Sequence, residues 1–562
     1  MKFVYFLLVT TTLTAQVHYP KDYFRLPLDI PMQLSGNFGE LRPNHFHAGF
    51  DFKTNQVEGL SVHAAADGYI SRIKISTSGY GKAIYITHPN GFTTVYGHLQ
   101  RAVGIIQEKI IALQYENKNY EIEAYFKPGE IPVKKGETIA ISGNTGGSDG
   151  PHLHFEFRDN KTEKIINPLF FGLDLKDDKN PIVSSLLVYP IDGNAIVNES
   201  KRPVHLNLSL QKDGTYLSEK VLANGRIGFG ISAIDFDDVS YNPNGVYKTQ
   251  LISNGKPIFG YEFNEMVFDE ARFVNALIDY SRYKKMHQRV QKLFMKHPYN
   301  WSNINQNVND GIISVNPNFL SVQRIEVSDY FQNKTVINIP VEYSIKKAKI
   351  EEEVQPTKYF IKAKVESNFE KDNVSVYFPA GTFYDDFYLN FDVKDGVVFL
   401  HEDVVPAHSN FTISIDATKS DPEDRKKMFI ASLYGNKWNY NTTKLVGTTF
   451  TCKTKTLGQF QLMKDTLAPK ITIAKSIENK WLTGIKTLQL TISDDLSGVK
   501  SYNGYLNDKW VLFEYEPKTK KISHTFDDAL LLEGQNKLKV VVTDNVGNST
   551  IFESHFFRSQ KK

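Results

Sequence analysis

The sequence lacks several features that mark common classes of protein. Cys452 is the only cysteine, so no intrachain disulfide bond can form, and a chain of 562 residues can bury enough surface to fold without one. Beyond the N-terminal segment, no apolar run approaches the ~20 residues that a membrane-spanning helix requires. The 66 basic and 63 acidic residues leave a formal charge of only +3, which gives no electrostatic footprint for nucleic acid. We therefore expect a folded, soluble, multidomain protein with no nucleic-acid partner and no transmembrane segment.

The first residues have the pattern of an export signal. Lys2 supplies a positive start, residues 3–13 form a short apolar run, and Ala15 stands at a suitable cleavage position. No cysteine follows that could carry a lipid anchor. The sequence thus predicts a signal peptide over residues 1–15 and a protein that works in the periplasm or outside the cell.

Aromatic residues are abundant, and they favour an all-β fold. The 38 Phe and 29 Tyr pack well on pleated surfaces. Over residues 16–172, short alternating segments such as 83–87 and 138–142 are bounded by glycine turns, which is typical of antiparallel hairpins. Residues 101–131 are too long for a simple hairpin connection, and we expect them to add a pair of strands and to narrow a groove.

The remainder of the chain contains two copies of one β-rich unit, over residues 173–345 and 465–562. Each copy opens with a proline that enters a strand, continues to an acidic turn and ends in a similar last strand. The paired segments are Pro181 and Pro469, residues 235–240 and 494–499, and residues 327–335 and 542–550. Repeats of this size predict immunoglobulin-like sandwiches.

Two further features complete the expected organisation. Apolar residues at helical spacing predict a helical insertion at about residues 269–298 within the first copy, ended by Pro298. Residues 346–464, between the copies, form another strand-rich unit. We therefore expect one small antiparallel β domain followed by about three β-sandwich domains.

The residues that indicate chemistry lie in the first domain. In residues 151–156, His152, His154 and Glu156 alternate with apolar residues, so on a strand they share one face. His47 and Asp51 stand four positions apart around a glycine and add a nitrogen and an oxygen ligand. Two imidazoles and one carboxylate suit a catalytic zinc ion, which keeps one position for water and lowers the pKa of that water. These residues alone do not decide whether His152 or His154 binds the metal.

Other histidines have to be weighed against this set. His98 ends a strand, and a histidine near the metal but not bound to it could transfer a proton or stabilise an oxyanion. His45 would share a strand face with His47 and is the alternative ligand. His63 and His88 adjoin a strand and a turn, and we interpret them as structural.

The ordered motifs of residues 38–156 resemble the lysostaphin/LytM family of peptidoglycan endopeptidases. They run from Phe38-Gly39-Glu40-Leu41-Arg42 and the His47-x-Gly-x-Asp51 motif, through Gly79-Tyr80-Gly81 and Tyr96-x-His98-Leu99, to Gly143-Asn144-Thr145-Gly146 and Pro151-His152-Leu153-His154. The resemblance implies one zinc ion per chain, bound by His47, Asp51 and His154, with His98 and His152 as the catalytic pair. It also implies a small antiparallel barrel-sandwich fold with the site in a groove.

The resemblance leads to one main expectation about function and one alternative. The main expectation is an exported zinc-dependent endopeptidase that hydrolyses peptide cross-links of peptidoglycan, with envelope proteins as further partners of the β domains. The alternative is a non-catalytic envelope regulator or wall-binding module that activates an amidase, which the large β portion would suit.

Overall fold

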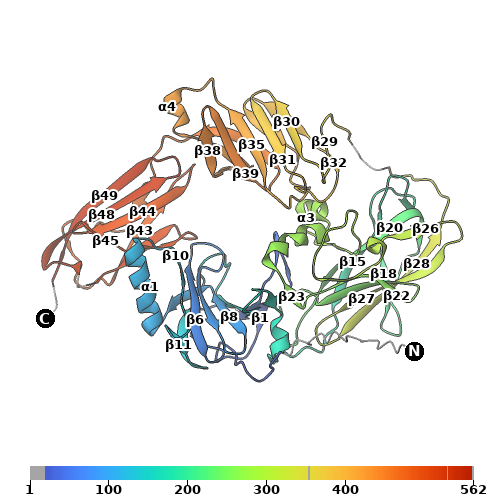
Figure 1. The fold of residues 1–562 in the computed structure, drawn as a ribbon, viewed down its shortest axis with the longest axis horizontal. Helices are drawn as coiled ribbons and strands as arrows, with labels where there is room; N and C mark the ends of the chain where they lie inside the picture. Colours follow the sequence, from blue (N-terminus) through green and yellow to red (C-terminus); the bar gives the residue numbers. More distant parts are fainter. Residues whose placement is uncertain (1–18, 352–354, 528–529, 560–562) are drawn as a thin grey trace, which may run out of the picture.

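The computed structural model describes residues 19–351, 355–527 and 530–559, and the expected signal peptide at residues 1–15 lies outside them. The fold is all-β, as the sequence predicts, with a small antiparallel β domain followed by additional β domains. In the described part, no helix is both long and apolar enough to span a membrane. Figure 1 shows the strand-rich units following one another around a ring, in which the red C-terminal unit returns to the blue N-terminal one.

The first unit is built around one antiparallel sheet in the order β1-β4-β13-β8-β7-β6-β10, with a separate three-stranded sheet in the order β5-β12-β9. Alternation along β13 buries Leu153, Phe155 and Phe157 in the core, as the sequence pattern predicts. The strands of this unit are β1 (Leu34–Gly36), β2 (Leu41–Arg42), β3 (His45–Phe46), β4 (Phe50–Lys53), β5 (Ser61–His63), β6 (Gly68–Ile75), β7 (Lys82–Thr87), β8 (Phe92–Gly97), β9 (Leu99–Ala102), β10 (Ile122–Tyr125), β11 (Pro132–Val133), β12 (Thr138–Ser142), β13 (His152–Asp159) and β14 (Ile165–Ile166), followed by the 3-10 helix η1 (Pro168–Phe171).

Residues 101–131 do not form the expected pair of strands. They contain helix α1 (Gly104–Asn117), and only β10 joins the sheet, beside β6. Ile106, Ile110 and Gln114 are the buried residues of α1 and recur every four positions, so one helix face packs inward. Helix α1 contacts β9, β10 and the last unit of the chain. These contacts give no support to the prediction that residues 101–131 narrow the groove.

The second unit packs so closely on the first that the two share a single core, which extends from Phe24 to Val341. Strand β23 pairs with β14 of the first unit, and the Trp301 ring stacks on Phe46 at 4.9 Å between centroids. Its strands are β15 (Ile182–Pro190), β16 (Ile196–Val197), β17 (Val204–Leu206), β18 (Leu208–Leu210), β19 (Tyr216–Ser218), β20 (Val221–Ile234), β21 (Lys248–Ser253), β22 (Lys256–Glu262), β23 (Glu265–Met266), β24 (Gln291–Lys292), β25 (Ile304–Asn307), β26 (Ile313–Val315), β27 (Leu320–Ser328) and β28 (Lys334–Tyr343), with the 3-10 helix η3 (Asn309–Gly311).

The helical insertion of the second unit is shorter than predicted. It consists of η2 (Phe268–Phe273), α2 (Val274–Leu277) and α3 (Tyr280–Met286), and His287 ends α3 in the left-handed conformation. The following residues return to the sheet, where β24 pairs with β20, and Val290 and Phe294 belong to a small core. Sheet pairing therefore prevails over an apolar spacing that also suits a helix.

The third and fourth units each consist mainly of two sheets, in which most neighbouring strands are antiparallel. The third contains β29 (Phe360–Ile361), β30 (Ser367–Lys371), β31 (Val374–Phe378), β32 (Phe387–Tyr388), β33 (Phe391–Lys394), β34 (Val397–Leu400), β35 (Phe411–Asp416), α4 (Pro422–Arg425), β36 (Met428–Tyr434), β37 (Lys437–Tyr440), β38 (Thr443–Val446), β39 (Thr449–Thr454) and β40 (Gly458–Lys464). The fourth contains β41 (Lys470–Thr472), β42 (Lys480–Trp481), β43 (Thr487–Ser493), β44 (Val499–Leu506), β45 (Lys509–Val511), β46 (Glu514–Glu516), β47 (Lys521–Thr525), β48 (Gly534–Asp544) and β49 (Ser549–Arg558).

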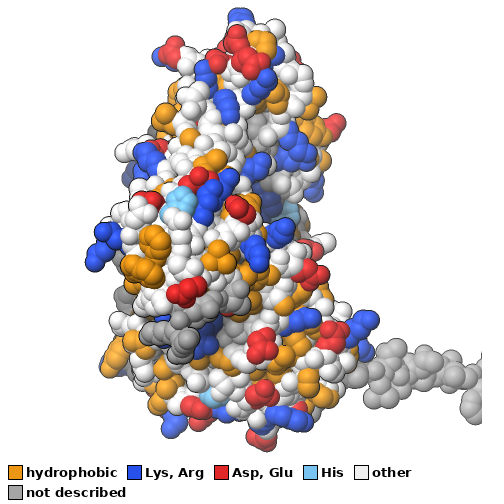
Figure 2. All heavy atoms as spheres, turned by 90° about the vertical axis from the view of Figure 1, so that its left-hand side faces the viewer, with side chains coloured by type: hydrophobic (Ala, Val, Ile, Leu, Met, Phe, Trp, Pro, Cys, Tyr) orange, Lys and Arg blue, Asp and Glu red, His pale blue; other side chains and the backbone are white. Residues whose placement is uncertain are grey.

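Polar contacts close the ring in Figure 1. Lys284 pairs with Asp403 at 2.5 Å between the second and third units. Lys82 pairs with Glu514 at 2.6 Å, and Tyr115 of α1 meets the edge of Trp510 at 5.4 Å, so the fourth unit rests on the first. On the face shown in Figure 2, acidic and basic side chains are interspersed and do not gather into a large patch of one sign.

Candidate metal centre

The register of two neighbouring strands assembles the site. In the antiparallel pairing of β13 with its two neighbours, His154 lies opposite Asp51 of β4 on one side and Gly97 of β8 on the other. Gly97 precedes His98, which turns out of β8 in the left-handed conformation (φ 57°). The loop before β4 carries His47 and passes so close to β13 that a Cβ at Gly49 would lie 2.2 Å from the Phe155 carbonyl oxygen. Glycine is therefore required at that point of the His47-x-Gly-x-Asp51 motif.

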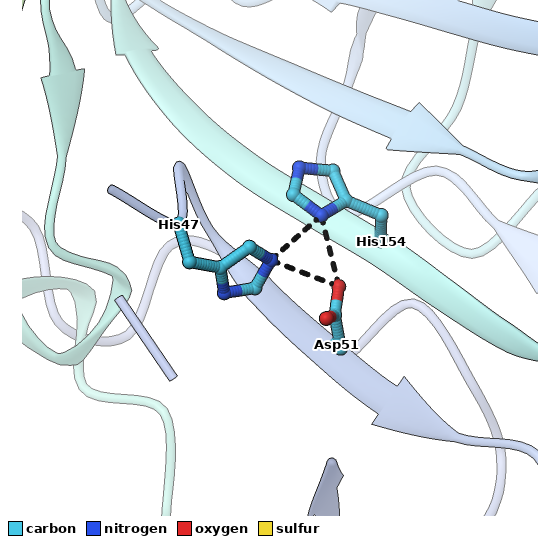
Figure 3. Close-up of side chains that lie close together, drawn as sticks. All are labelled: His47, Asp51 and His154. Atoms are coloured by element: carbon cyan, nitrogen blue, oxygen red, sulfur yellow. Dashed lines mark hydrogen bonds and ion pairs between the residues drawn. The ribbon is translucent and has the colours of Figure 1, made fainter. Parts of the chain in front are cut away.

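Three ligand atoms converge, as Figure 3 shows. His47 Nε2 lies 3.0 Å from Asp51 Oδ1 and 3.1 Å from His154 Nδ1, and the latter two atoms are 2.9 Å apart. Ligands of a tetrahedral zinc ion at ~2.05 Å stand about 3.3 Å from one another, so the triangle has nearly the size that zinc requires. All three residues are buried, and two imidazoles with one carboxylate leave a fourth position for a further ligand. The donor set and its spacing therefore fit zinc.

His98 and His152 stand beside this triangle, so the structure brings together all five residues that the sequence singles out. Their rings are 4.7 Å apart between centroids, and His152 Nε2 lies 3.3 Å from Asp51 Oδ1. His98 Nδ1 donates to the Thr145 carbonyl at 2.7 Å, and His152 Nδ1 donates to the Gly150 carbonyl at 2.9 Å. Because a carbonyl only accepts, each neutral ring keeps its lone pair on Nε2.

The two histidines of the triangle are held from behind. His47 Nδ1 donates to the Asn37 carbonyl at 2.7 Å, and His154 Nε2 donates to Glu156 Oε1 at 2.8 Å. Glu156 is fully buried, is paired with Arg158 at 2.6 Å and accepts a hydrogen bond from the Tyr80 hydroxyl. The Tyr80 ring also stacks on His154, at 4.9 Å. These contacts fix the ring orientation that directs Nδ1 of His154 to the centre.

Sequence reasoning places Glu156 on the face of His152 and His154 but assigns it no role, and it misses Tyr80 and Arg158 as supports. For Arg158 a signal exists, because the period of two that joins His152, His154 and Glu156 continues to residue 158. Tyr80 belongs to the Gly79-Tyr80-Gly81 motif of the resemblance, but its contact with Glu156 joins residues far apart in the chain, so the motif does not reveal this partner.

The electrostatics of the site follow from burial and from these neighbours. Burial raises the pKa of Asp51, but the charge of His47 and the close imidazole nitrogens of His152, His154 and His47 outweigh it and hold the pKa well below its ordinary value. Burial also raises the pKa of Glu156, yet Arg158 and His154 lower it to about 2. Burial, together with the charges of His154 and His152, lowers the pKa of His98 to about 3, so that ring is neutral at neutral pH. The centre thus combines two ionised carboxylates with a neutral imidazole.

The histidines outside the site have other partners. His45 is exposed and contacts the Pro43 carbonyl at 2.9 Å, and the triangle contains His47 instead. His63 is held by the Gly136 carbonyl at 3.0 Å, and His88 lies between the Asp67 carbonyl and the Thr94 hydroxyl. The structural interpretation of His63 and His88 agrees with these contacts.

One wall beside the site comes from the second unit. A cavity of about 70 Å³ is lined by His45 and Tyr80 of the first unit and by Met266, Phe268 and Trp301 of the second. Its surface is mostly apolar, and Tyr80 connects it to His154. Groups that approach the centre from this side therefore meet residues that the first unit alone does not supply.

Comparison with known proteins agrees with the first part of the chain. Residues 45–113 and 117–168 match the profile of "Peptidase family M23", and residues 358–465 match that of a "Zu5-like domain". A DD-carboxypeptidase/endopeptidase Mpg of Neisseria meningitidis is 35% identical over 127 residues, which cover 23% of this chain and 23% of that protein. A peptidoglycan DD-endopeptidase ShyC of Vibrio cholerae is 32% identical over 150 residues, which cover 26% of this chain and 28% of that protein.

Among solved structures, the catalytic domain of lysostaphin from Staphylococcus simulans is 25% identical, with a TM-score of 0.19; the match covers 25% of this chain and 91% of that one. The chain spans only about a quarter of the length of the curated relatives it matches. The resemblance that the motifs indicate is nevertheless confirmed by the match of residues 45–113 and 117–168 to the profile of peptidase family M23.

Proposed function

We propose that this protein is an exported zinc-dependent endopeptidase that hydrolyses peptide cross-links of bacterial peptidoglycan. The observation that carries the proposal is the convergence of His47, Asp51 and His154 within 3.1 Å, beside the His98 and His152 pair. The names of the Neisseria and Vibrio relatives support a wall peptide as the substrate. The N-terminal export pattern is consistent with action in the envelope.

His47, Asp51 and His154 would hold the zinc ion, which when bound supplies an activated water and polarises the scissile carbonyl. His98 and His152 present Nε2 lone pairs, and one of them accepts the proton of the attacking water. Once protonated, the same ring donates a hydrogen bond to the developing oxyanion or returns the proton to the leaving amine. Asp51 remains ionised next to His152. If His152 is the ring that takes the proton, the Asp51 carboxylate stabilises the resulting imidazolium.

The test uses the chain from residue 19 with one equivalent of zinc, incubated with purified sacculi of several wall chemotypes. We expect new amino groups from the wild type and none above background from His154→Ala. His205→Ala, at an exposed position, serves as the matched control and should retain activity. Mass spectrometry of the released fragments identifies the bond that is cleaved.

The catalytic pair is tested separately from the ligands. His152→Ala should bind one zinc ion per chain yet lose about 10²–10⁴-fold in kcat, the range of a general acid–base contribution. If the wild-type protein binds zinc but releases no new amino groups from any of the sacculi, the proposal is wrong. Cellular effects that survive in His154→Ala would instead favour the non-catalytic regulator.

A further inference from the structure

Two clusters of aspartates remain outside the chemistry described above. Asp177, Asp235 and Asp329 in the second unit, and Asp465, Asp494 and Asp544 in the fourth, each place three carboxylate oxygens within 4.8 Å of one another. Five of the six residues are buried and Asp494 is half-buried. Among the ion pairs of the described residues, none includes any of these six. Buried charges are normally paired or bound to a metal, so three adjacent carboxylates without a cation require an explanation.

The two clusters occupy equivalent positions in the two copies of the repeat. Asp177 and Asp465 each stand four residues before the proline that opens the copy. Asp235 and Asp494 each follow a strand whose last residue pairs with the residue after that proline. Near the third position, Asn333 and Asn548 donate to Asp329 and Asp544 at 2.6 and 2.7 Å. The same three acids therefore recur with the same surroundings.

Further oxygen atoms lack partners at the first cluster. Asp235 and Asn244 are each only 5% exposed. Nevertheless, Oδ1 of Asp235 and Oδ1 of Asn244 accept no hydrogen bond from any described residue. The Asn244 amide nitrogen donates to Asp237 at 3.3 Å, which leaves the oxygen on the opposite branch of the amide without a role. Asn244 and all three acids of the cluster line one cavity of about 30 Å³. This space suits one small ion surrounded by oxygen atoms.

Both clusters lie at a junction with the preceding unit. The cavity of the first cluster is also lined by Asn37, whose side chain exchanges two hydrogen bonds of 2.8 Å with the Gly245 backbone. The Asn37 carbonyl in turn holds His47 of the metal centre. At the second cluster, the Asp465 amide donates to the Lys427 carbonyl of the third unit, and Lys427 Nζ donates to the Val546 carbonyl of the fourth.

We propose that each cluster binds one calcium ion, and that the two ions fix the second unit on the first and the fourth unit on the third. Calcium takes six to eight oxygen ligands at about 2.3–2.6 Å, and ligand oxygens up to 4.8 Å apart can share one such ion. The donors are all oxygen atoms, which argues against zinc and copper. Magnesium demands a stricter octahedron and retains its waters, so a mostly buried carboxylate cage suits calcium better.

The charges support this assignment. Without a cation, burial and the neighbouring carboxylates raise the pKa of Asp177 to about 7 and that of Asp235 to about 8. Burial raises the pKa of Asp494 as well. A divalent cation offsets most of the repulsion among three carboxylates and makes their ionised form favourable.

The experiment measures calcium binding to the full chain after divalent ions have been removed with a chelating resin. Equilibrium dialysis should give two calcium ions per chain, and thermal unfolding should shift upward by about 5 °C at saturating calcium, with a smaller shift for magnesium. Asp235→Asn and Asp494→Asn should each remove one bound ion. In calcium-free buffer each substitution should instead raise the melting temperature, because it relieves repulsion.

Neighbouring aspartates provide matched controls. Asp238→Asn and Asp495→Asn change residues that pair with Lys179 and Lys470, and both variants should still bind two ions. His154→Ala should also bind two, since the clusters are separate from the metal centre. Asn244→Ala, a milder change, should weaken binding at the first cluster by roughly tenfold. Absence of bound calcium, or stoichiometry that is unchanged in Asp235→Asn and Asp494→Asn, overturns the proposal.

Discussion

At the scale of single residues, Glu156 connects the metal centre to the core. Its carboxylate lies between Arg158 and His154 and is fully buried. Glu156→Gln keeps the shape of the side chain but removes the charge that orients His154 and neutralises Arg158. We expect zinc affinity to fall by about 10–100-fold.

Competition with a chromophoric chelator measures this affinity. Glu163→Gln is the matched control, because Glu163 also pairs with Arg158, at 3.4 Å, but is exposed and remote from His154. Equal zinc affinity in Glu156→Gln and the wild type would show that Glu156 does not position the ligand.

His88 gives the first unit a pH dependence of stability. Burial lowers its pKa from 6.5 to about 4 in the folded protein. Between these values the unfolded chain binds the additional proton, so stability is complete above pH 6.5 and is lost as the pH falls towards 4. The loss between pH 7 and pH 5 should be about 2 kcal/mol.

Urea unfolding at the two pH values measures the effect. His88→Gln, which can keep a hydrogen bond to Asp67 or Thr94, should reduce the loss between the two pH values by about 2 kcal/mol, whereas His205→Gln at an exposed position should not change it. A pH dependence that persists unchanged in His88→Gln assigns the loss to other groups.

At the scale of secondary-structure elements, the sequence predicts strands that carry the site better than it predicts the insertions. The alternation in β13 and the glycine of the His47-x-Gly-x-Asp51 motif are local signals, and the structure follows both. The sequence pattern does not predict helix α1, because its amphipathic face is short and ends in the polar residue Gln114. The pattern predicts a helical insertion that is too long, because Val290 and Phe294 pack from an extended segment whose conformation depends on pairing with β20.

The contact between α1 and the fourth unit is an element-scale feature that can be tested. Tyr115 meets Trp510 edge-on, and such a pair contributes about 0.5–1.5 kcal/mol beyond its buried area. Local opening of α1 breaks this contact, so loss of the contact lowers the free energy of opening. Trp510→Ala should therefore speed amide hydrogen exchange in α1 by roughly three- to tenfold. Trp481→Ala, at a position that is 63% exposed, should leave α1 unchanged, and equal exchange in both variants would show that the contact does not stabilise α1.

At the scale of the whole molecule, the family domain is not an independent body. Its sheet continues into the second unit through β14 and β23, and Asn167 donates to the Phe263 carbonyl at 3.0 Å. Phe46 lies against both Trp301 and Phe263. The domain boundaries at residues 172 and 345 remain our interpretation. The shared core indicates that the parts of the chain on the two sides of residue 172 form one folding unit.

This shared core leads to a prediction about truncated chains. Residues 19–172 alone would expose Phe46 and the edge of β14, which would leave an apolar patch and an unpaired strand. We expect this fragment to aggregate or to lack a dispersed NMR spectrum. Residues 19–347 retain the core from Phe24 to Val341, so they should fold and bind one zinc ion. A well-dispersed spectrum and full zinc binding from residues 19–172 would show that the metal centre forms without the second unit. If residues 19–172 fail to fold while residues 19–347 fold, the second unit is needed to form the metal centre.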